Sequence, residues 1–280
     1  MIIVFGTVCV SFSAIFVRSA SAPSMILVFY RVFFAALLLF PVVAIKYRQE
    51  IKELSGKDVI FCACSGLFLG LHFTLYFESL KYTSIASSVV LVDTEVFFVA
   101  AAMYLISHET VSKNGMVGIG AAFAGSVIIA LADMGSGSNI VIGDLLALAG
   151  SFCMAVYTVI GRRCRNHIST SVYTLFVYGF AALTVGVGAL AKSLPFTGYT
   201  TADYLAAFGM TIFCTLLGHS VYSWGLKYIQ ASFISTVKLL EPLFASILGF
   251  LVFREIPSVF VVAGGAAVIW GIAYYSRSME

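Results

Sequence analysis

The chain has 280 residues, of which 61% are hydrophobic and only 10% are charged, and its formal net charge is +3. So much apolar sequence excludes a water-soluble globule, because it needs lipid around it, and the small, dispersed charge gives no reason to expect a nucleic-acid partner. We therefore expect an integral membrane protein whose first partner is the lipid bilayer.

The first half contains five apolar runs, at residues 2–20, 24–46, 59–80, 85–107 and 113–132. Each is close to the roughly 20 residues that an α-helix needs to cross a bilayer, and Gly, Pro or charged clusters separate the runs. The first run begins without the basic segment and small-residue cleavage site of a signal peptide, so we expect a retained helix.

The second half contains five more runs, at residues 141–162, 169–191, 203–226, 231–253 and 257–275. They are too long and too continuously apolar for the alternating strands of a membrane barrel, which leaves helices as the spanning structure. Ten spans and their short connections use the whole chain and leave no room for a catalytic domain. The predicted fold is an all-α polytopic membrane protein with ten transmembrane helices.

The basic residues predict the orientation of these spans. If the N-terminus is cytoplasmic, four of the sixteen basic residues lie in outer connections and two, Arg31 and Lys238, lie within spans. The remaining ten lie on the cytoplasmic side: Lys46, Arg48, Lys52, Lys57, Lys113, Arg162, Arg163, Arg165, Lys227 and Arg277. This bias predicts that both termini are cytoplasmic, in the inner membrane of a bacterium, and that Arg162 and Arg163 anchor the topology.

The two halves look like copies of one unit. A shift of 146 positions gives twelve identities in fifty positions, and they pair Tyr76, Leu80, Lys81, Tyr82, Glu95, Phe98, Leu105, Glu109, Ser112, Gly118, Ala121 and Gly125 with Tyr222, Leu226, Lys227, Tyr228, Glu241, Phe244, Leu251, Glu255, Ser258, Gly264, Ala267 and Gly271. We predict one repeat at residues 1–136 and another at 137–280. Five spans per copy is an odd number, so the repeats are inverted. Inverted repeats are typical of alternating-access transporters, although duplication can also simply build a stable bundle.

The ends of the two copies resemble a known family. LKYTSIASSVVLVDTEVFFVAAAMYLISHE at 80–109 and LKYIQASFISTVKLLEPLFASILGFLVFRE at 226–255 are similar to the EamA repeats of the drug/metabolite transporter superfamily. The resemblance implies a ten-helix carrier of amino acids or other small metabolites, often an exporter, with a cavity lined by helices one, three, four, six, eight and nine. Glu241-Pro242 fits the family pattern. Val96 stands where a proline is common, so a matching kink in the fourth helix is not implied.

Three charged residues near the membrane midplane are the main candidates for substrate binding. Glu95 and Glu241 occupy matched positions in the fourth and ninth helices, and Lys238 precedes Glu241 by one helical turn. Lys238 and Glu241 either form an ion pair that neutralises both, or a substrate or proton competes for one member of that pair. Asp93 lies about 200° from Glu95 around the helix, so the two carboxylates cannot face one cavity. The sequence leaves open whether Lys238 pairs with Glu241 or with Asp93.

Further polar residues are candidates for substrate choice or proton coupling. Glu78 differs from its repeat mate Trp224, which favours a role in substrate choice. Arg31 lies towards the outer end of the second span, where it either reaches the membrane interface or serves function. His72 and His219 either relay protons, together with Asp93 as a candidate, or are simply hydrogen-bonded between packed helices.

Aromatic and small residues complete the set. Tyr76, Tyr157, Tyr222 and Trp224 are candidates for contact with an amphipathic solute, with packing as the alternative. Small residues at helical spacing form faces that let helices approach closely, within one chain or at the contact of a homodimer: Gly118, Ala122 and Gly125, and Gly264, Ala267 and Gly271. The six cysteines show no metal-ligand spacing, so we expect no metal and no cofactor.

These features predict a secondary carrier that exports or exchanges amino acids or related amphipathic solutes. The sequence has no P-loop, HExxH or GxSxG motif, so ATP-driven transport and enzymatic activity are not expected. An uptake carrier for a nucleotide-, vitamin- or cofactor-like metabolite is the alternative within the same class. An intramembrane enzyme or a passive channel is the alternative from another class.

Overall fold

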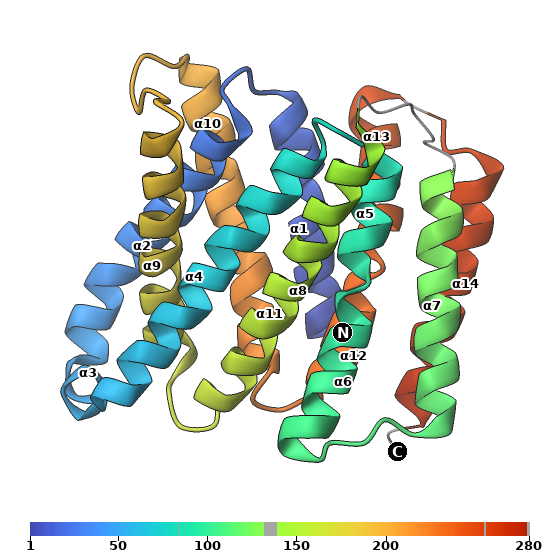
Figure 1. Ribbon diagram of the computed structural model, residues 1–280, viewed down its shortest axis with the longest axis horizontal. Coiled ribbons are helices and arrows are strands. Elements are labelled where there is room, and N and C mark those ends of the chain that lie inside the picture. Colours follow the sequence, from blue (N-terminus) through green and yellow to red (C-terminus); the bar gives the residue numbers. More distant parts are fainter. Residues whose placement is uncertain (84, 132–138, 255, 279–280) are drawn as a thin grey trace.

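The computed structural model describes residues 1–83, 85–131, 139–254 and 256–278, and every regular element in these ranges is a helix (Figure 1). The first half contains α1 (Ile2–Arg18), α2 (Ser24–Lys46), α3 (Arg48–Glu53), α4 (Gly56–Ser79), α5 (Ile85–Asp93), α6 (Glu95–Ser107) and α7 (Lys113–Leu131). The second half contains α8 (Ile140–Cys164), α9 (Thr170–Ala191), α10 (Thr201–Met210), the π-helix η1 (Thr211–His219), α11 (Ser220–Gly225), α12 (Ala231–Lys238), α13 (Glu241–Phe253) and α14 (Val259–Arg277).

Nine helices in the described ranges are long and apolar enough to cross a membrane, and α1 is a shorter apolar helix. Three of these spans consist of several elements: α5 and α6 form the fourth span, α10, η1 and α11 form the eighth, and α12 and α13 form the ninth. The prediction of an all-α polytopic protein with ten transmembrane helices is confirmed.

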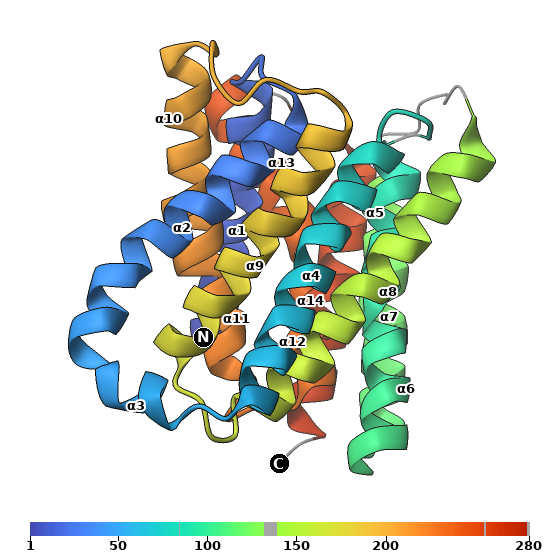
Figure 2. The same cartoon turned by 60° about the vertical axis from the view of Figure 1, so that its left-hand side comes forward.

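The bundle has two ends, which we name by what they carry. The termini end holds α3 and lies on the side towards which both chain termini point, and the far end holds the connections from α1 to α2, α4 to α5 and α9 to α10 (Figures 1 and 2). Capping boxes start helices at both ends: Ser55 with Asp58 begins α4 and Thr200 with Asp203 begins α10. In each box the side chains satisfy backbone N–H groups that a helix N-terminus leaves without partners.

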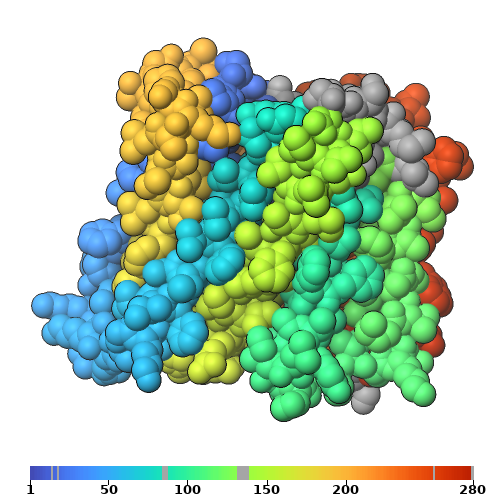
Figure 3. Space-filling model, viewed as in Figure 1, coloured from blue at the N-terminus to red at the C-terminus, as the bar shows by residue number. Residues whose placement is uncertain are grey.

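The outer faces of the helices are apolar. Figure 3 shows α4 and α8 lying side by side across one face of the bundle, with α9 and α10 on one flank and α6 and α7 on the other. On this face Leu67 is 43% exposed and Phe152 is 52% exposed. Apolar side chains that are exposed in this way are suited to contact with lipid tails.

The small-residue faces of α7 and α14 pack against each other within the chain. A Cβ atom added to Gly125 would lie 2.5 Å from the carbonyl oxygen of Gly264, and one added to Gly118 would lie 2.6 Å from that of Gly271. These backbones therefore approach too closely for any larger residue. The structure therefore shows these faces packing helices together within one chain, which is one of the two roles expected for them.

Two spans are broken at matched positions. Thr94 separates α5 from α6 and Leu239 and Leu240 separate α12 from α13, so Glu95 and Glu241, which are 146 residues apart, each begin the second half of a span. Pro242 lies in the first turn of α13 and accounts for the break in the ninth span. The fourth span has Val96 at the position of Pro242, which left a matching kink open, and the structure shows a break there without a proline.

The break in the fourth span has a side-chain cause. The Thr94 hydroxyl donates to the Leu91 carbonyl, and the Thr94 amide donates to the same carbonyl at 3.3 Å. These bonds to the residue three positions earlier tighten the chain and end α5. In the ninth span, the amide of Leu239 donates to Thr236 at 3.1 Å and that of Leu240 donates to Val237 at 3.1 Å, which gives the same tightened turn.

Candidate functional site

Lys238 and Glu95 form a buried ion pair where the two broken spans meet. The Lys238 Nζ and Glu95 Oε1 atoms are 2.9 Å apart, and the side chains are only 10% and 6% exposed. Lys238 ends α12 and Glu95 begins α6. A cation at a helix C-terminus and an anion at a helix N-terminus both match the helix dipole, so the breaks themselves favour the pair.

This pairing corrects the sequence analysis. Neither of the two partners considered there, Glu241 and Asp93, pairs with Lys238, because its partner is Glu95 of the other half. The break after Lys238 places Glu241 in a different half-helix, so the two residues are no longer one turn apart on one face. Asp93 accepts a hydrogen bond from Ser126 of α7, which confirms that Asp93 and Glu95 face different neighbours.

Glu241 differs from its repeat mate in having no partner for its side chain. Within the described ranges the carboxylate forms no hydrogen bond and no ion pair, and the Ser11 hydroxyl donates at 3.2 Å to the Glu241 backbone carbonyl instead. Arg31 and Lys238 are the cations that act on the carboxylate electrostatically. The N-terminus of α13 adds a partial positive charge. Glu241 therefore lies in a cationic environment, but none of the described cations contacts its carboxylate.

Arg31 of α2 is buried beside this group. It is 2% exposed, its Nε donates to the Thr215 hydroxyl at 2.7 Å, and its guanidinium lies 4.7 Å from the centre of the Phe73 ring. It follows Ser24, the first residue of α2, by seven positions, which is about 10 Å along the helix. The alternative in which Arg31 reaches the membrane interface is therefore wrong.

The π-helix η1 presents Thr215 to Arg31. The Thr215 hydroxyl also donates to the Met210 carbonyl five residues earlier at 3.3 Å, and the Thr215 carbonyl accepts from the hydroxyls of Tyr178 and Ser220, at 3.2 Å each. These side chains satisfy backbone groups that the wider helical turn leaves misaligned. π-Helical turns are often found at functional sites, and this one was not expected from the sequence.

The two candidate histidines lie in different environments. His72 is 6% exposed, and its Nδ1 lies 3.0 Å from the Gly150 carbonyl, so it is hydrogen-bonded between packed helices. His219 is 5% exposed, and its Nδ1 has no partner in the described part of the chain. The ring of His219 contacts Phe73 with a centroid distance of 5.5 Å. The role of either histidine in proton coupling stays a prediction.

Three of the four candidate aromatics surround the ion pair and the histidines. Tyr222 donates to Thr7 at 3.0 Å, and its ring lies 5.3 Å from the Lys238 Nζ. Tyr157 lies 3.0 Å from the Ser223 hydroxyl, and the Tyr76 ring stacks on His72. Trp224 is not part of this group, because it packs against Tyr228 in the connection at the termini end.

A cavity of about 240 Å³ opens at the far end, and we call it the vestibule. Glu78 lines it and pairs with Lys81 at 3.0 Å and with Lys192 at 2.8 Å, so this candidate lies apart from the midplane group. Of the lining residues on α2 and α4, Val28 and Phe73 lie farthest along their helices from the far end. The same Phe73 contacts both Arg31 and His219. Phe73 therefore connects the vestibule with the buried polar group.

Polar contacts link the two halves at the termini end. The Arg162 guanidinium lies 2.9 Å from Glu109 and also donates to the carbonyls of Leu226 and Ile229, which join α11 to α12. His167 lies 2.7 Å from Asp58. Arg162 was expected only to anchor the topology, and its role as a link between connections was missed.

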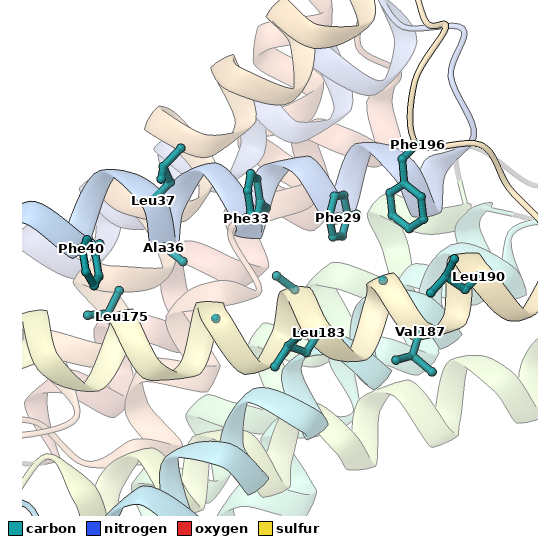
Figure 4. A pocket seen from close by; sticks show the side chains of 13 residues that line it. Phe29, Phe33, Ala36, Leu37, Phe40, Leu175, Leu183, Val187, Leu190 and Phe196 are labelled. Carbon is teal, nitrogen blue, oxygen red and sulfur yellow. The ribbon is translucent and has the colours of Figure 1, made fainter.

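An apolar groove of about 550 Å³ lies between α2 and α9 (Figure 4). Phe29, Phe33 and Phe40 of α2 stand opposite Leu183 and Leu190 of α9, and none of the residues that line it has a polar side chain. Such a groove offers no hydrogen bond to a polar solute. It is suited to lipid contact rather than to the binding of a metabolite.

Comparison with known proteins places this geometry in a wider group. The model of the EamA-like transporter family matches residues 1–131 and 141–277. A protein of Archaeoglobus fulgidus named as an uncharacterized transporter is 26% identical over 259 residues, which cover 88% of this chain and 85% of that protein. Another, YyaM of Bacillus subtilis, is 30% identical over 206 residues, which cover 71% of this chain and 66% of that protein.

A solved crystal structure shares the fold. It superposes with a TM-score of 0.81 at 17% sequence identity, and the superposition covers 99% of this chain and 96% of the other. At this level of identity the likeness extends to the arrangement of the helices and not to the function.

Proposed function

Because this chain belongs to the EamA-like transporter family, we propose that it is a secondary carrier that exports or exchanges a small amphipathic metabolite, such as an amino acid, by alternating access. It acts as a carrier rather than as an enzyme. The bias of basic residues supports placing it in the cytoplasmic membrane of a bacterium with both termini in the cytoplasm.

One observation carries the proposal: the buried Lys238–Glu95 pair joins the two halves where both broken spans begin their second segment. Ionisable groups at this depth cost on the order of 3 kcal/mol each on insertion scales, so a pair of them is retained for a purpose. Broken helices at the midplane, at the interface between repeats, are where secondary transporters build their binding sites.

The two ends of the bundle support alternating access. The far end has the vestibule, which Glu78 and Lys192 of opposite halves line and across which they pair at 2.8 Å, and Arg162 and Glu109 link the halves at the termini end. With the termini in the cytoplasm, we assign this arrangement to the outward-facing state. The inward-facing state requires the Arg162–Glu109 contact to break and the vestibule to close, with the midplane group remaining between them.

Counterflow in proteoliposomes tests the proposal. Vesicles with the purified protein are loaded with one unlabelled amino acid at a time, and entry of the labelled form is followed. A carrier gives a transient overshoot that depends on the internal solute, whereas a channel gives none. Vesicles with Glu241→Gln protein should lose the overshoot, and full counterflow in this variant would remove Glu241 from the binding site.

A further inference from the structure

Arg31 is a buried cation with an incomplete set of partners. The residue is 2% exposed and its Nε is satisfied by Thr215, but its Nη2 has no hydrogen-bond partner in the described part of the chain. A buried polar group left in this way costs roughly 1–3 kcal/mol, and more when it is charged. An apolar residue at this position would avoid that cost, so Arg31 is not explained by the stability of the bundle.

No carboxylate among the described residues forms an ion pair with Arg31. Lys238, the other buried cation of the site, is already paired with Glu95 at 2.9 Å. Glu241 lies within electrostatic range of Arg31, but in the described ranges the two side chains form neither an ion pair nor a hydrogen bond. Among the described residues, the Arg31 guanidinium and the Glu241 carboxylate thus lack an ion-pair partner, and they are close but not in contact.

The vestibule leads to this guanidinium. Val28 is the residue of α2 that lines the vestibule farthest from the far end, and Arg31 follows it by one helical turn. Phe73 also lines the vestibule, and its ring lies under the guanidinium and against His219. In the described part of the chain, the Nδ1 of His219 is also buried without a partner. Two polar groups that lack a partner among the described residues thus contact the same ring, that of Phe73.

The chemistry of these groups selects the ligand. A guanidinium presents parallel N–H donors that match a carboxylate, and such charge-assisted bonds are among the strong ones. A phosphate dianion is disfavoured, because Arg31 is the one cation of this group that lacks an ion-pair partner among the described residues and the Glu241 carboxylate is close. A solute that carries a carboxylate together with an ammonium group can satisfy Arg31 and Glu241 at once.

We propose that Arg31 is the receptor for a carboxylate group of the transported solute, a role that rests on the proposed carrier function. The Nη2 atom donates to the carboxylate after the Phe73 ring turns aside, and the solute replaces a missing partner rather than an existing one. Arg31 is thus a specificity-determining residue that separates carboxylate-bearing solutes from neutral ones.

Paired solutes test this role on the purified protein in nanodiscs. Thermal shifts are measured with each of the L-amino acids, with the corresponding carboxamide, which lacks only the negative charge, and with inorganic phosphate. We expect at least one acid to stabilise the wild-type protein, with its carboxamide at least about tenfold weaker and phosphate without effect. Equal binding of acid and carboxamide, stabilisation by phosphate, or no stabilisation by any acid would overturn the proposal.

Variants separate binding from folding. Arg31→Met should abolish the shift caused by the acid, Arg31→Lys should weaken it, and Arg277→Met, at the exposed end of α14, should leave it unchanged. Without ligand, Arg31→Met should unfold at the same temperature as the wild type or higher, because Thr215 keeps its bond to Met210. A clear loss of stability in Arg31→Met without ligand, or undiminished binding of the acid by it, contradicts the proposal.

Counterflow distinguishes failure of this site from failure of the carrier function. If the wild type shows counterflow of some solute and Arg31→Met shows it equally, the Arg31 site is wrong and the carrier function stands. If the wild type shows no counterflow of any solute, the carrier function itself is wrong.

Discussion

The two helix breaks have the same position in the repeat but different chemistry. Each places a glutamate at the start of its second segment, Glu95 in α6 and Glu241 in α13. Glu95 is neutralised by Lys238 at 2.9 Å, whereas Glu241 has no side-chain partner in the described ranges. The two breaks are thus alike in position but not in charge, because in the described ranges one glutamate has an ion-pair partner and the other has none.

The largest expected effect comes from breaking the ion pair. Lys238→Met leaves Glu95 buried without a counter-charge, and removal of one partner of a buried pair costs about 3–5 kcal/mol. We expect a large fall in the unfolding temperature and loss of counterflow. The double variant Glu95→Gln with Lys238→Met should recover most of the stability without recovering transport. Equal instability of the single and double variants would show that the pairing is not what stabilises the breaks.

Glu241→Gln should show the opposite pattern. The side chain of Glu241 has no partner among the described residues to lose, so the unfolding temperature should change little, while counterflow should fall at least about tenfold. The same measurements on Glu95→Gln are the matched comparison, because that variant removes the same charge from the equivalent position and should lose stability. If both variants behave alike, the two breaks are not chemically distinct and the comparison fails.

A smaller effect is expected at the termini end. Glu109→Gln weakens the contact with Arg162, whose side chain is 21% exposed, and a pair of this kind is worth roughly 0.5–1 kcal/mol. The inward-facing population should rise by about two- to fivefold, as read from distances between spin labels on Lys113→Cys and Lys227→Cys. Glu53→Gln is the control, because Gln49 of the same short helix is the one hydrogen-bond partner of Glu53 in the described ranges. A shift in the control as large as in Glu109→Gln would argue against the contact.

The smallest effect is expected from making the breaks alike. Val96→Pro places a proline where α13 has Pro242, in the first turn of α6. A proline inside a continuous helix costs about 3 kcal/mol or more, but one in the first turn is tolerated. We expect a folded protein with a loss of stability well below that figure, measured by thermal unfolding. A loss of 3 kcal/mol or more would mean that the fourth span is a continuous helix.

The sequence predicted the ten spans well, because a bilayer demands long apolar runs and such runs are visible without tertiary information. It also predicted Glu95, Glu241 and Lys238 as the charged group of the midplane. It did not predict the pairing, because the i, i+3 argument assumes an unbroken helix and the break after Lys238 separates it from Glu241. Residues 85–107 contain no proline, so nothing in the sequence of the fourth span indicated the break at Thr94.

Arg31 was the least predictable member of the site. A single arginine in an apolar span is a visible signal, but whether it reaches the interface depends on what packs around it. The contacts that hold it, Thr215 of η1 and Phe73 of α4, come from spans far apart in the sequence. The π-helical turn that brings Thr215 into place has no recognisable pattern in the chain.

The central claim is that the two halves open opposite ends of one polar site in turn, and paired distances test it most directly. Spin labels are placed on exposed residues of opposite halves, on Lys113→Cys and Lys227→Cys at the termini end and on Lys81→Cys and Thr197→Cys at the far end, in a background without the six native cysteines. On addition of a solute that shows counterflow, we predict that the distances at the termini end lengthen as those at the far end shorten. Distances that change in the same direction at both ends, or at neither end while counterflow proceeds, would contradict the account.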